Sequence, residues 1–187
     1  NDLKLLRERG LADQLQEYAH SGGNLLGLCG GLQMLGQHLE DPDQLEGGPS
    51  SSEGLGLLPI KTQFSRDKTL RQRDLISRWP ALTEVRGFEL HHGRTTAEAD
   101  LMSLMEEPNL GWWKRGVDGG VIAGSYLHGL LDNGPWRRHW LNHLRSGKGM
   151  SKLSIERPHH ASHRDQLLDR LTDAFEQHVD IAPLLGS

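Results

Sequence analysis

The segment NLLGLCGGLQMLGQHL, residues 24–39, restricts the fold more than any other part of the sequence. A short apolar run ends at Cys29 between glycines, and apolar residues then recur at helical spacing as far as Leu39. This pattern predicts a strand that turns sharply into a helix, with the side chain of the turn residue projecting from the end of a sheet. The flanking glycines suit a turn whose backbone is crowded and takes positive φ values.

The rest of the chain alternates between helical and strand-like patterns. Apolar spacing predicts helix between Leu3 and Tyr18 with a break near Gly10, and the helix after Cys29 is expected to stop before Pro42. Strand-like runs and amphipathic helices then alternate, which indicates the α/β fold class. The predicted strands cover 54–64, 82–95 and 119–128, the helices 136–144 and 164–179, and an exposed polar loop 41–54. The last helix carries Leu167, Leu168, Leu171, Ala174 and Phe175 on one face.

Composition excludes several classes of protein. The 187 residues suit one domain, and a net charge of −4 gives no electrostatic basis for binding nucleic acid. A single cysteine rules out an internal disulfide, and no stretch approaches the roughly 20 apolar residues that cross a bilayer. We therefore expect a cytoplasmic protein with no nucleic-acid or membrane partner. Because the sequence begins at Asn1 without a methionine, we expect it to be a fragment of a longer polypeptide.

The predicted turn gives Cys29 the environment of a nucleophile. At a helix N-terminus, the positive end of the helix dipole lowers a thiol pKa and favours the thiolate. Backbone N–H groups of Gly30 and its neighbours would point at an oxyanion that forms beside the sulfur. The alternative is that Cys29 is an inert, buried, small apolar residue, as most free cysteines are.

A nucleophilic thiol usually works with a histidine, and His128 is the candidate that the pattern favours. The run VIAGSYLHG repeats the arrangement around Cys29, with an apolar strand that ends at a reactive side chain followed by glycine. If the two strands are parallel, both side chains lie at the same carboxyl edge of the sheet. The alternative is a surface histidine in a loop.

Four motifs in order, GLCGGLQMLG, GLGLLP, GFELHHGRT and GSYLHGLLD, resemble the glutamine amidotransferase domain of the cobyric acid synthase family. With the closing RDQLLDRLTDAFEQHVD, the resemblance covers essentially the whole chain, residues 1–187. It implies a class I, flavodoxin-like fold with a mostly parallel sheet flanked by helices. It also implies hydrolysis of L-glutamine and delivery of ammonia to an N-terminal synthetase domain, absent from this chain. That domain would use ATP and Mg²⁺ to activate corrinoid carboxylates, and this domain would need no cofactor of its own.

The resemblance also implies roles for single residues. Cys29 matches the nucleophile, His128 the catalytic base, and Gly30 an oxyanion-hole amide. Gln33 matches a residue that contacts the substrate glutamine. The HHGRT segment corresponds to a region near the substrate's amino and carboxylate groups, which brings in His91, Gly93 and Arg94.

Three departures from the family pattern accompany these roles. Many class I amidotransferases have H-x-E, whereas Gly129 and Leu130 follow His128 here, so we expect a Cys–His pair without an orienting carboxylate and no such role for Asp132. Leu32 stands where the family commonly has tyrosine. The strand that normally precedes DLKLLRERG and completes the oxyanion hole is absent from this sequence.

Other functions remain open at this stage. Within the family, cobyrinic acid a,c-diamide synthase and the amidotransferase of lipid II isoglutaminyl synthase are close alternatives. Outside it, an α/β-hydrolase-type cysteine hydrolase or a noncatalytic binding module would keep a similar turn. The HHASH segment at 159–163 has no cysteine or carboxylate within it, so we expect no metal site.

Overall fold

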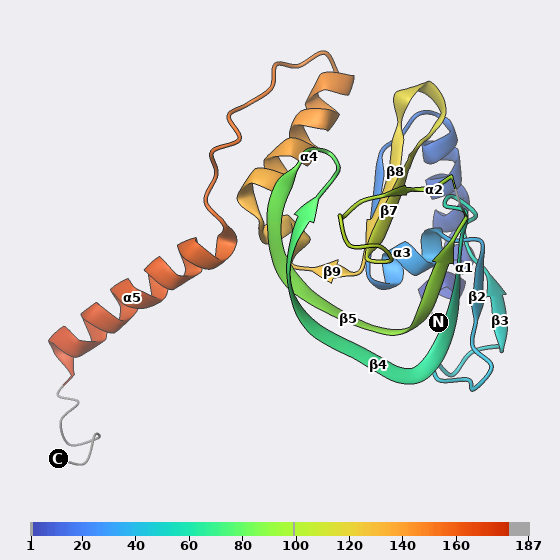
Figure 1. Ribbon diagram of the computed structural model, residues 1–187, viewed down its shortest axis with the longest axis horizontal. Helices are drawn as coiled ribbons and strands as arrows, with labels where there is room; N and C mark the ends of the chain where they lie inside the picture. Colours follow the sequence, from blue (N-terminus) through green and yellow to red (C-terminus); the bar gives the residue numbers. More distant parts are fainter. Residues whose placement is uncertain (1, 99, 180–187) are drawn as a thin grey trace.

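Two β-sheets organise residues 2–98 and 100–179, the part of the chain that the computed structural model describes (Figure 1). The strands are β1 Leu25–Leu28, β2 His38–Glu40, β3 Ser51–Glu53, β4 Ile60–Ser77, β5 Thr83–Ala97, β6 Met102–Ser103, β7 Gly111–Arg115, β8 Val121–Ser125 and β9 Leu127–His128. The helices are α1 Asp2–Glu8, α2 Leu11–His20, α3 Gly30–Leu35, α4 Gly134–Gly147 and α5 His160–His178, with 3₁₀ turns η1 Val117–Gly119 and η2 Leu130–Asp132.

The first sheet has the order β1-β8-β7-β6, and its inner strand β8 is largely apolar because it is covered on both faces. All five residues of β8 are buried. β1 and β8 run parallel, and Leu28 at the end of β1 pairs with Ser125 at the end of β8. The two strands therefore end at the same edge of the sheet. Cys29 follows one of them directly and His128 follows the other three residues later.

The second sheet has the order β3-β2-β4-β5-β9 and is dominated by the long, curved hairpin of β4 and β5 (Figure 1). A register shift between Gln63 and Lys68 interrupts the pairing of the two strands. The short strand β9 adds to the far side of β5, where His128 pairs with Phe88. The β4–β5 hairpin thus passes the edge of the first sheet at which β1 and β8 end.

The α/β class and the flanking helices agree with the sequence-based expectation, but strand direction differs from it. Among the described strands only the pairs β1–β8 and β2–β4 are parallel, and the other pairs are antiparallel. The expectation of a mostly parallel sheet is therefore wrong in this detail. The reason is that β4–β5 and β7–β8 are sequential neighbours joined by short connections, which pair antiparallel.

Two predicted boundaries also need correction. The helix after Cys29 ends at Leu35 instead of continuing to Leu39, because His38–Glu40 pairs with both β4 and β3. The polar segment 41–54 contains the short strand β3 in addition to loop. The break in the first helix near Gly10 is confirmed, with Gly10 in the left-handed conformation at φ 67°.

The short helix α3 is held by close packing against β1 and β8. Six residues make a helix too short to be stable alone, so its stability comes from burial. Leu32 is completely buried, which contributes about 2 kcal/mol. A Cβ on Gly124 would lie 2.6 Å from the Leu32 side chain, and one on Gly27 would lie 2.7 Å from the backbone of Gly31. Glycine at these two strand positions lets the helix approach the sheet.

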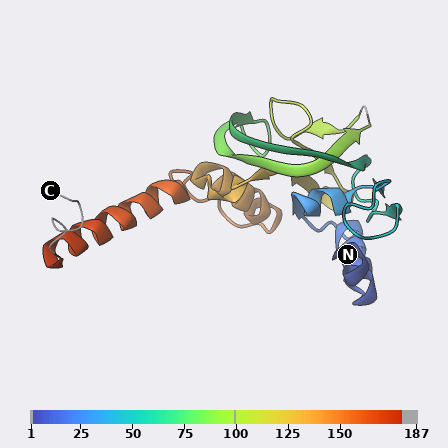
Figure 2. The same ribbon diagram turned by 90° about the horizontal axis from the view of Figure 1, so that it is seen from below.

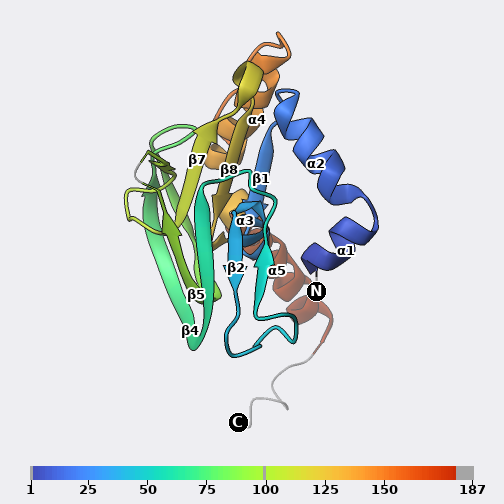
Figure 3. The same cartoon turned by 90° about the vertical axis from the view of Figure 1, so that its right-hand side faces the viewer.

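Helices α1, α2 and α4 each bury residues in the hydrophobic core, whereas α5 buries none. Figure 3 shows α1 and α2 on one side of the molecule and the β4–β5 hairpin on the other, with α3 between them. Helix α4 buries Trp136 and Trp140. Helix α5 projects from the body, as Figure 2 shows, and none of its residues is buried. Its predicted apolar face is present but exposed, with Leu171 at 66%.

We predict that Gly27→Ala destabilises the protein by about 1–3 kcal/mol, because the added methyl group would overlap the backbone of α3. The matched control is Gly31→Ala, where an added Cβ meets nothing within 4 Å. An alanine there should be neutral or stabilise the helix by up to about 1 kcal/mol. Urea unfolding of both variants measures the difference, and equal stabilities would contradict this account of the packing.

Candidate active site

Cys29 occupies a strained turn between β1 and α3. Its backbone has φ 52° and ψ −114°, a positive φ that is rare for a residue with a side chain. The N–H of Cys29 donates to the Ser125 carbonyl at 2.8 Å, which ties the turn to the end of β8. The expectation that the neighbouring glycines take the positive φ is not met, because Cys29 itself takes it.

One carbonyl group brings Cys29 and His128 together. The Sγ of Cys29 donates to the Leu90 carbonyl oxygen at 3.4 Å, and Nε2 of His128 lies 3.2 Å from the same oxygen. A carbonyl oxygen only accepts, so Nε2 is the protonated nitrogen of this ring. The sulfur and Nε2 can be no farther apart than the sum of these two distances. The structure therefore juxtaposes the two residues through β5.

Burial raises the pKa of the Cys29 thiol above its ordinary value, although a hydrogen bond from the Gly30 backbone opposes the shift. The sequence predicted a lowered pKa from the dipole of the following helix. That prediction is wrong in sign for this structure, because desolvation of the charged sulfur by burial is the largest influence on this pKa. The Gly30 N–H nonetheless faces the sulfur, as the turn geometry predicted.

Gln33 lies one helical turn after Cys29 and its side chain is fixed by two acceptors. Its Nε2 donates to the Tyr126 hydroxyl at 3.2 Å and to the His92 carbonyl at 3.5 Å. These bonds join α3 to β5 and to the residue that follows β8. Gln33 therefore presents an ordered amide beside Cys29.

His91 belongs to a buried cluster that the sequence analysis did not identify. Its Nε2 contacts Glu89 at 2.8 Å, its ring stacks on Tyr126 at 3.8 Å between centroids, and Arg73 also bonds to Glu89. Burial alone would raise the pKa of Glu89, but hydrogen bonds from His91 and Arg73 outweigh it and hold that pKa below its usual range. The signal available in the sequence was the two-residue spacing of Glu89 and His91, which places them on one face of a strand.

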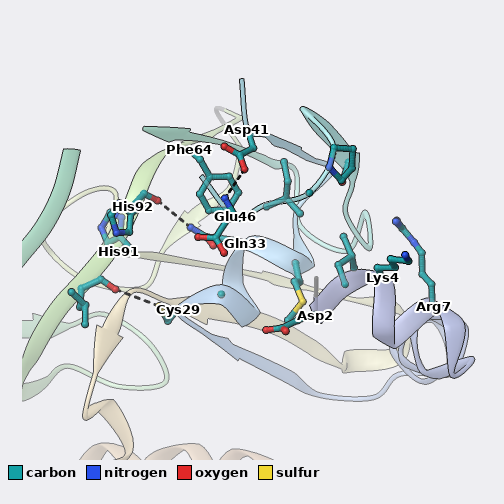
Figure 4. Close-up of a pocket in the computed structure, with 18 of the residues that line it drawn as sticks. Asp2, Lys4, Arg7, Cys29, Gln33, Asp41, Glu46, Phe64, His91 and His92 are labelled. Atoms are coloured by element: carbon teal, nitrogen blue, oxygen red, sulfur yellow. Dashed lines mark hydrogen bonds between the residues drawn. The ribbon is translucent and has the colours of Figure 1, made fainter. Parts of the chain in front are cut away.

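A cleft of about 680 Å³ opens beside Cys29. Figure 4 shows Cys29, Gln33, His91 and His92 towards one end and Lys4 and Arg7 of α1 towards the other. A cleft of this size is within the usual range for a small-molecule site, and it carries both acidic and basic side chains. No group of histidine, cysteine and carboxylate residues able to hold a metal occurs within 2–98 and 100–179.

The other predicted substrate residues lie elsewhere on β5. Gly93 is buried at φ 85°, and a Cβ there would lie 2.3 Å from the Gln63 carbonyl oxygen. Arg94 is exposed, and neither residue is among the described residues that line the cleft. Gly93 thus serves the irregular pairing of β4 with β5.

His128 has no carboxylate partner in the described part of the chain. Its ring contacts are the Leu90 carbonyl and the ring of Phe88. Asp132 is exposed, and its carboxylate makes no hydrogen bond with any described residue. The Cys–His pair without an orienting carboxylate stays a prediction.

No described helix is long and apolar enough to cross a bilayer.

Residues 1–136 match a family model described as a CobB/CobQ-like glutamine amidotransferase domain. The chain is 59% identical over 186 residues to cobyric acid synthase of Parasynechococcus marenigrum (strain WH8102), and 55% identical over 186 residues to that of Synechococcus sp. (strain CC9605). Each alignment covers 98% of this chain, but only 38% and 37% of the two relatives. The chain thus spans less than two fifths of their length.

We predict that Cys29 is alkylated slowly by iodoacetamide at neutral pH, and that the rate rises with pH to a midpoint above the ordinary thiol pKa. The reason is that only the thiolate reacts and burial disfavours it. The pH profile of alkylation, followed by mass spectrometry, measures the midpoint. A midpoint below that of an unstructured cysteine peptide would contradict this result and restore the dipole argument.

Proposed function

Because this chain belongs to the CobB/CobQ-like glutamine amidotransferase domain family, we propose that it hydrolyses L-glutamine with Cys29 as nucleophile and His128 as its proton-transfer partner. The observation that supports this most is the Leu90 carbonyl, which accepts a hydrogen bond from both side chains. Two reactive groups from different strands meet at one atom beside a cleft. An inert buried cysteine would not need a histidine at this position.

The chemistry has two steps. The Cys29 sulfur attacks the side-chain amide carbon of glutamine, its proton passes to His128, and His128 protonates the leaving nitrogen so that ammonia departs. A γ-glutamyl thioester remains on Cys29. Water then attacks the thioester with His128 as the base, and glutamate leaves as the sulfur regains its proton.

In this arrangement the Cys29 thiol and the His128 ring are not aligned for proton transfer between them. The Leu90 carbonyl holds the thiol proton and the Nε2 proton of His128, so the ring has no lone pair directed at the sulfur. Catalytic hydrogen bonds are often poorly aligned before substrate binds. We propose that substrate binding releases both donors from this carbonyl, with the His128 ring proton on Nδ1, so that Nε2 accepts the thiol proton.

Substrate contacts are proposed on the same basis. Gly30 places its N–H beside the sulfur and would donate to the oxyanion of the tetrahedral intermediate. Gln33 and His91 line the cleft next to Cys29 and would bind the glutamine. We assign no substrate contact to Gly93 or Arg94, because neither lines the cleft.

We further propose that the ammonia serves cobyric acid synthesis in the cytoplasm. The support is that the relatives which match nearly the whole chain are named cobyric acid synthase, and that most of their length lies outside the match. In this proposal a synthetase domain activates carboxylates of a corrinoid with ATP and Mg²⁺, and ammonia from this domain amidates them. No cofactor is assigned to the glutaminase site itself.

The test of this function is a chimera in which this chain replaces the matching C-terminal part of the Parasynechococcus marenigrum cobyric acid synthase. Cys29→Ser should abolish glutamine-dependent amidation of the corrinoid and leave ammonia-dependent amidation intact, since free ammonia bypasses only the glutaminase site. Amide formation with each nitrogen source is measured by mass spectrometry. Loss of both activities in a folded variant, or of neither, would refute the proposal.

A second prediction separates the dyad from a triad. His128→Ala should lower glutamine-dependent turnover by about 10²- to 10⁴-fold, the usual contribution of general acid–base catalysis. Asp132→Asn should have little effect, because the Asp132 carboxylate makes no hydrogen bond or ion pair with any described residue. Steady-state glutamate release measures both variants. Comparable damage from the two substitutions would show that Asp132 completes a triad.

A further inference from the structure

His128 lacks a carboxylate partner among the described residues, yet a proton-transfer residue needs a fixed ring. To orient an imidazole, its surroundings must restrict both the plane of the ring and the rotation of the ring within that plane. In many sites a carboxylate sets both through the second ring nitrogen. Here the neighbouring strand β5 provides the contacts that restrict the ring.

Phe88 fixes the plane of the ring. The two rings stack with their centroids 4.8 Å apart and their planes inclined by 11°. Phe88 and His128 are directly paired in the β5–β9 register, so the backbone places the rings face to face. A Cβ on Gly87 would lie 2.1 Å from the His128 carbonyl oxygen, and this close approach of the strands needs glycine.

Leu90 meets one edge of the ring, and because the proposed mechanism releases this bond when glutamine binds, the Phe88 stack is the contact that persists. Leu90 lies two residues beyond Phe88, on the same face of β5, and its carbonyl accepts from Nε2 of His128 at 3.2 Å. One strand therefore holds the ring by its face and by one edge. The same Leu90 carbonyl holds the Cys29 sulfur, so the ring is set relative to the nucleophile.

Asn133 fixes the backbone that carries His128. It is 2% exposed, and its side chain bonds to Arg86 twice, accepting from the N–H and donating to the carbonyl, both at 2.9 Å. It also donates to the carbonyls of Gly129 at 3.0 Å and Leu130 at 3.2 Å. These bonds tie the residues after His128 to the residues before Phe88.

We infer that Phe88 is a positioning residue for His128, and that its ring takes the place of the orienting carboxylate of an H-x-E triad. The inference rests on the proposed function for its kinetic consequence, but not for the stacked geometry. Phe88 is well suited to a test because it is 36% exposed, so its replacement leaves the buried core intact. Asn133 is buried with four hydrogen bonds, so its replacement would also disturb folding.

The kinetic experiment compares Phe88→Leu, Phe88→Tyr and the control Ile76→Ala in the chimera. Phe88→Leu should lower kcat for glutamine on the order of 10- to 10²-fold with KM unchanged, because a misplaced catalytic group costs rate and not binding. Phe88→Tyr keeps the stack and should retain activity. Ile76 lies on the same hairpin at 39% exposure, away from His128, and its replacement should have no effect. Urea unfolding confirms that all three are folded.

A second measurement does not depend on turnover. In NMR spectra of this chain, the imidazole protons of His128 should be shifted upfield by the Phe88 ring, and a His128→Gln variant assigns them. Phe88→Leu should remove the shift. If the wild-type protein shows the shift but has no glutaminase activity, the proposed function is refuted. The positioning role of Phe88 then still stands. An unshifted wild-type spectrum, unchanged kcat in Phe88→Leu, or a loss in Phe88→Tyr or Ile76→Ala as large as that in Phe88→Leu would overturn the inference.

Discussion

The carbonyl of Leu90 is the contact on which the site depends. It accepts from the thiol that β1 delivers and from the imidazole that β8 and β9 deliver, so three segments far apart in sequence meet at one oxygen. The parallel pairing of β1 with β8 aligns the two strand ends, and the long β4–β5 hairpin carries Leu90 to that edge. The close packing of α3, which needs Gly27 and Gly124, keeps the Cys29 turn against the sheet.

Sequence patterns predicted the elements that depend mainly on residues close together in the sequence. The strand–turn–helix at Cys29, the break near Gly10 and the strand before His128 each follow from apolar spacing and glycine placement. The hairpin was less predictable, because its middle is polar: one face of residues 65–73 is solvent-exposed, and only pairing with β5 makes it strand. Helix α3 ended early for a similar reason, since tertiary pairing of His38–Glu40 overrides helical spacing.

The site residues also divide into those that sequence motifs revealed and those that only strand pairing revealed. Cys29, Gln33 and His91 were found from motifs, and the structure brings them to one cleft. The roles of Phe88, Leu90 and Glu89 were not predicted, because a stacked ring, a backbone carbonyl and a buried ion pair depend on register between strands. The sign of the Cys29 pKa shift was also missed, since sequence shows the helix dipole but not the depth of burial that opposes it.

Covalent trapping is the most direct test of the proposed role of Cys29 as the nucleophile of a glutaminase site. The wild-type chain and the His128→Ala variant are exposed to 6-diazo-5-oxo-norleucine, a glutamine analogue that alkylates the attacking nucleophile, and digested peptides are analysed by mass spectrometry. One adduct is expected, on the peptide that carries Cys29, formed faster in the wild type and suppressed by L-glutamine. An adduct on another residue, or labelling of Cys29 that glutamine does not suppress, would contradict the proposed role.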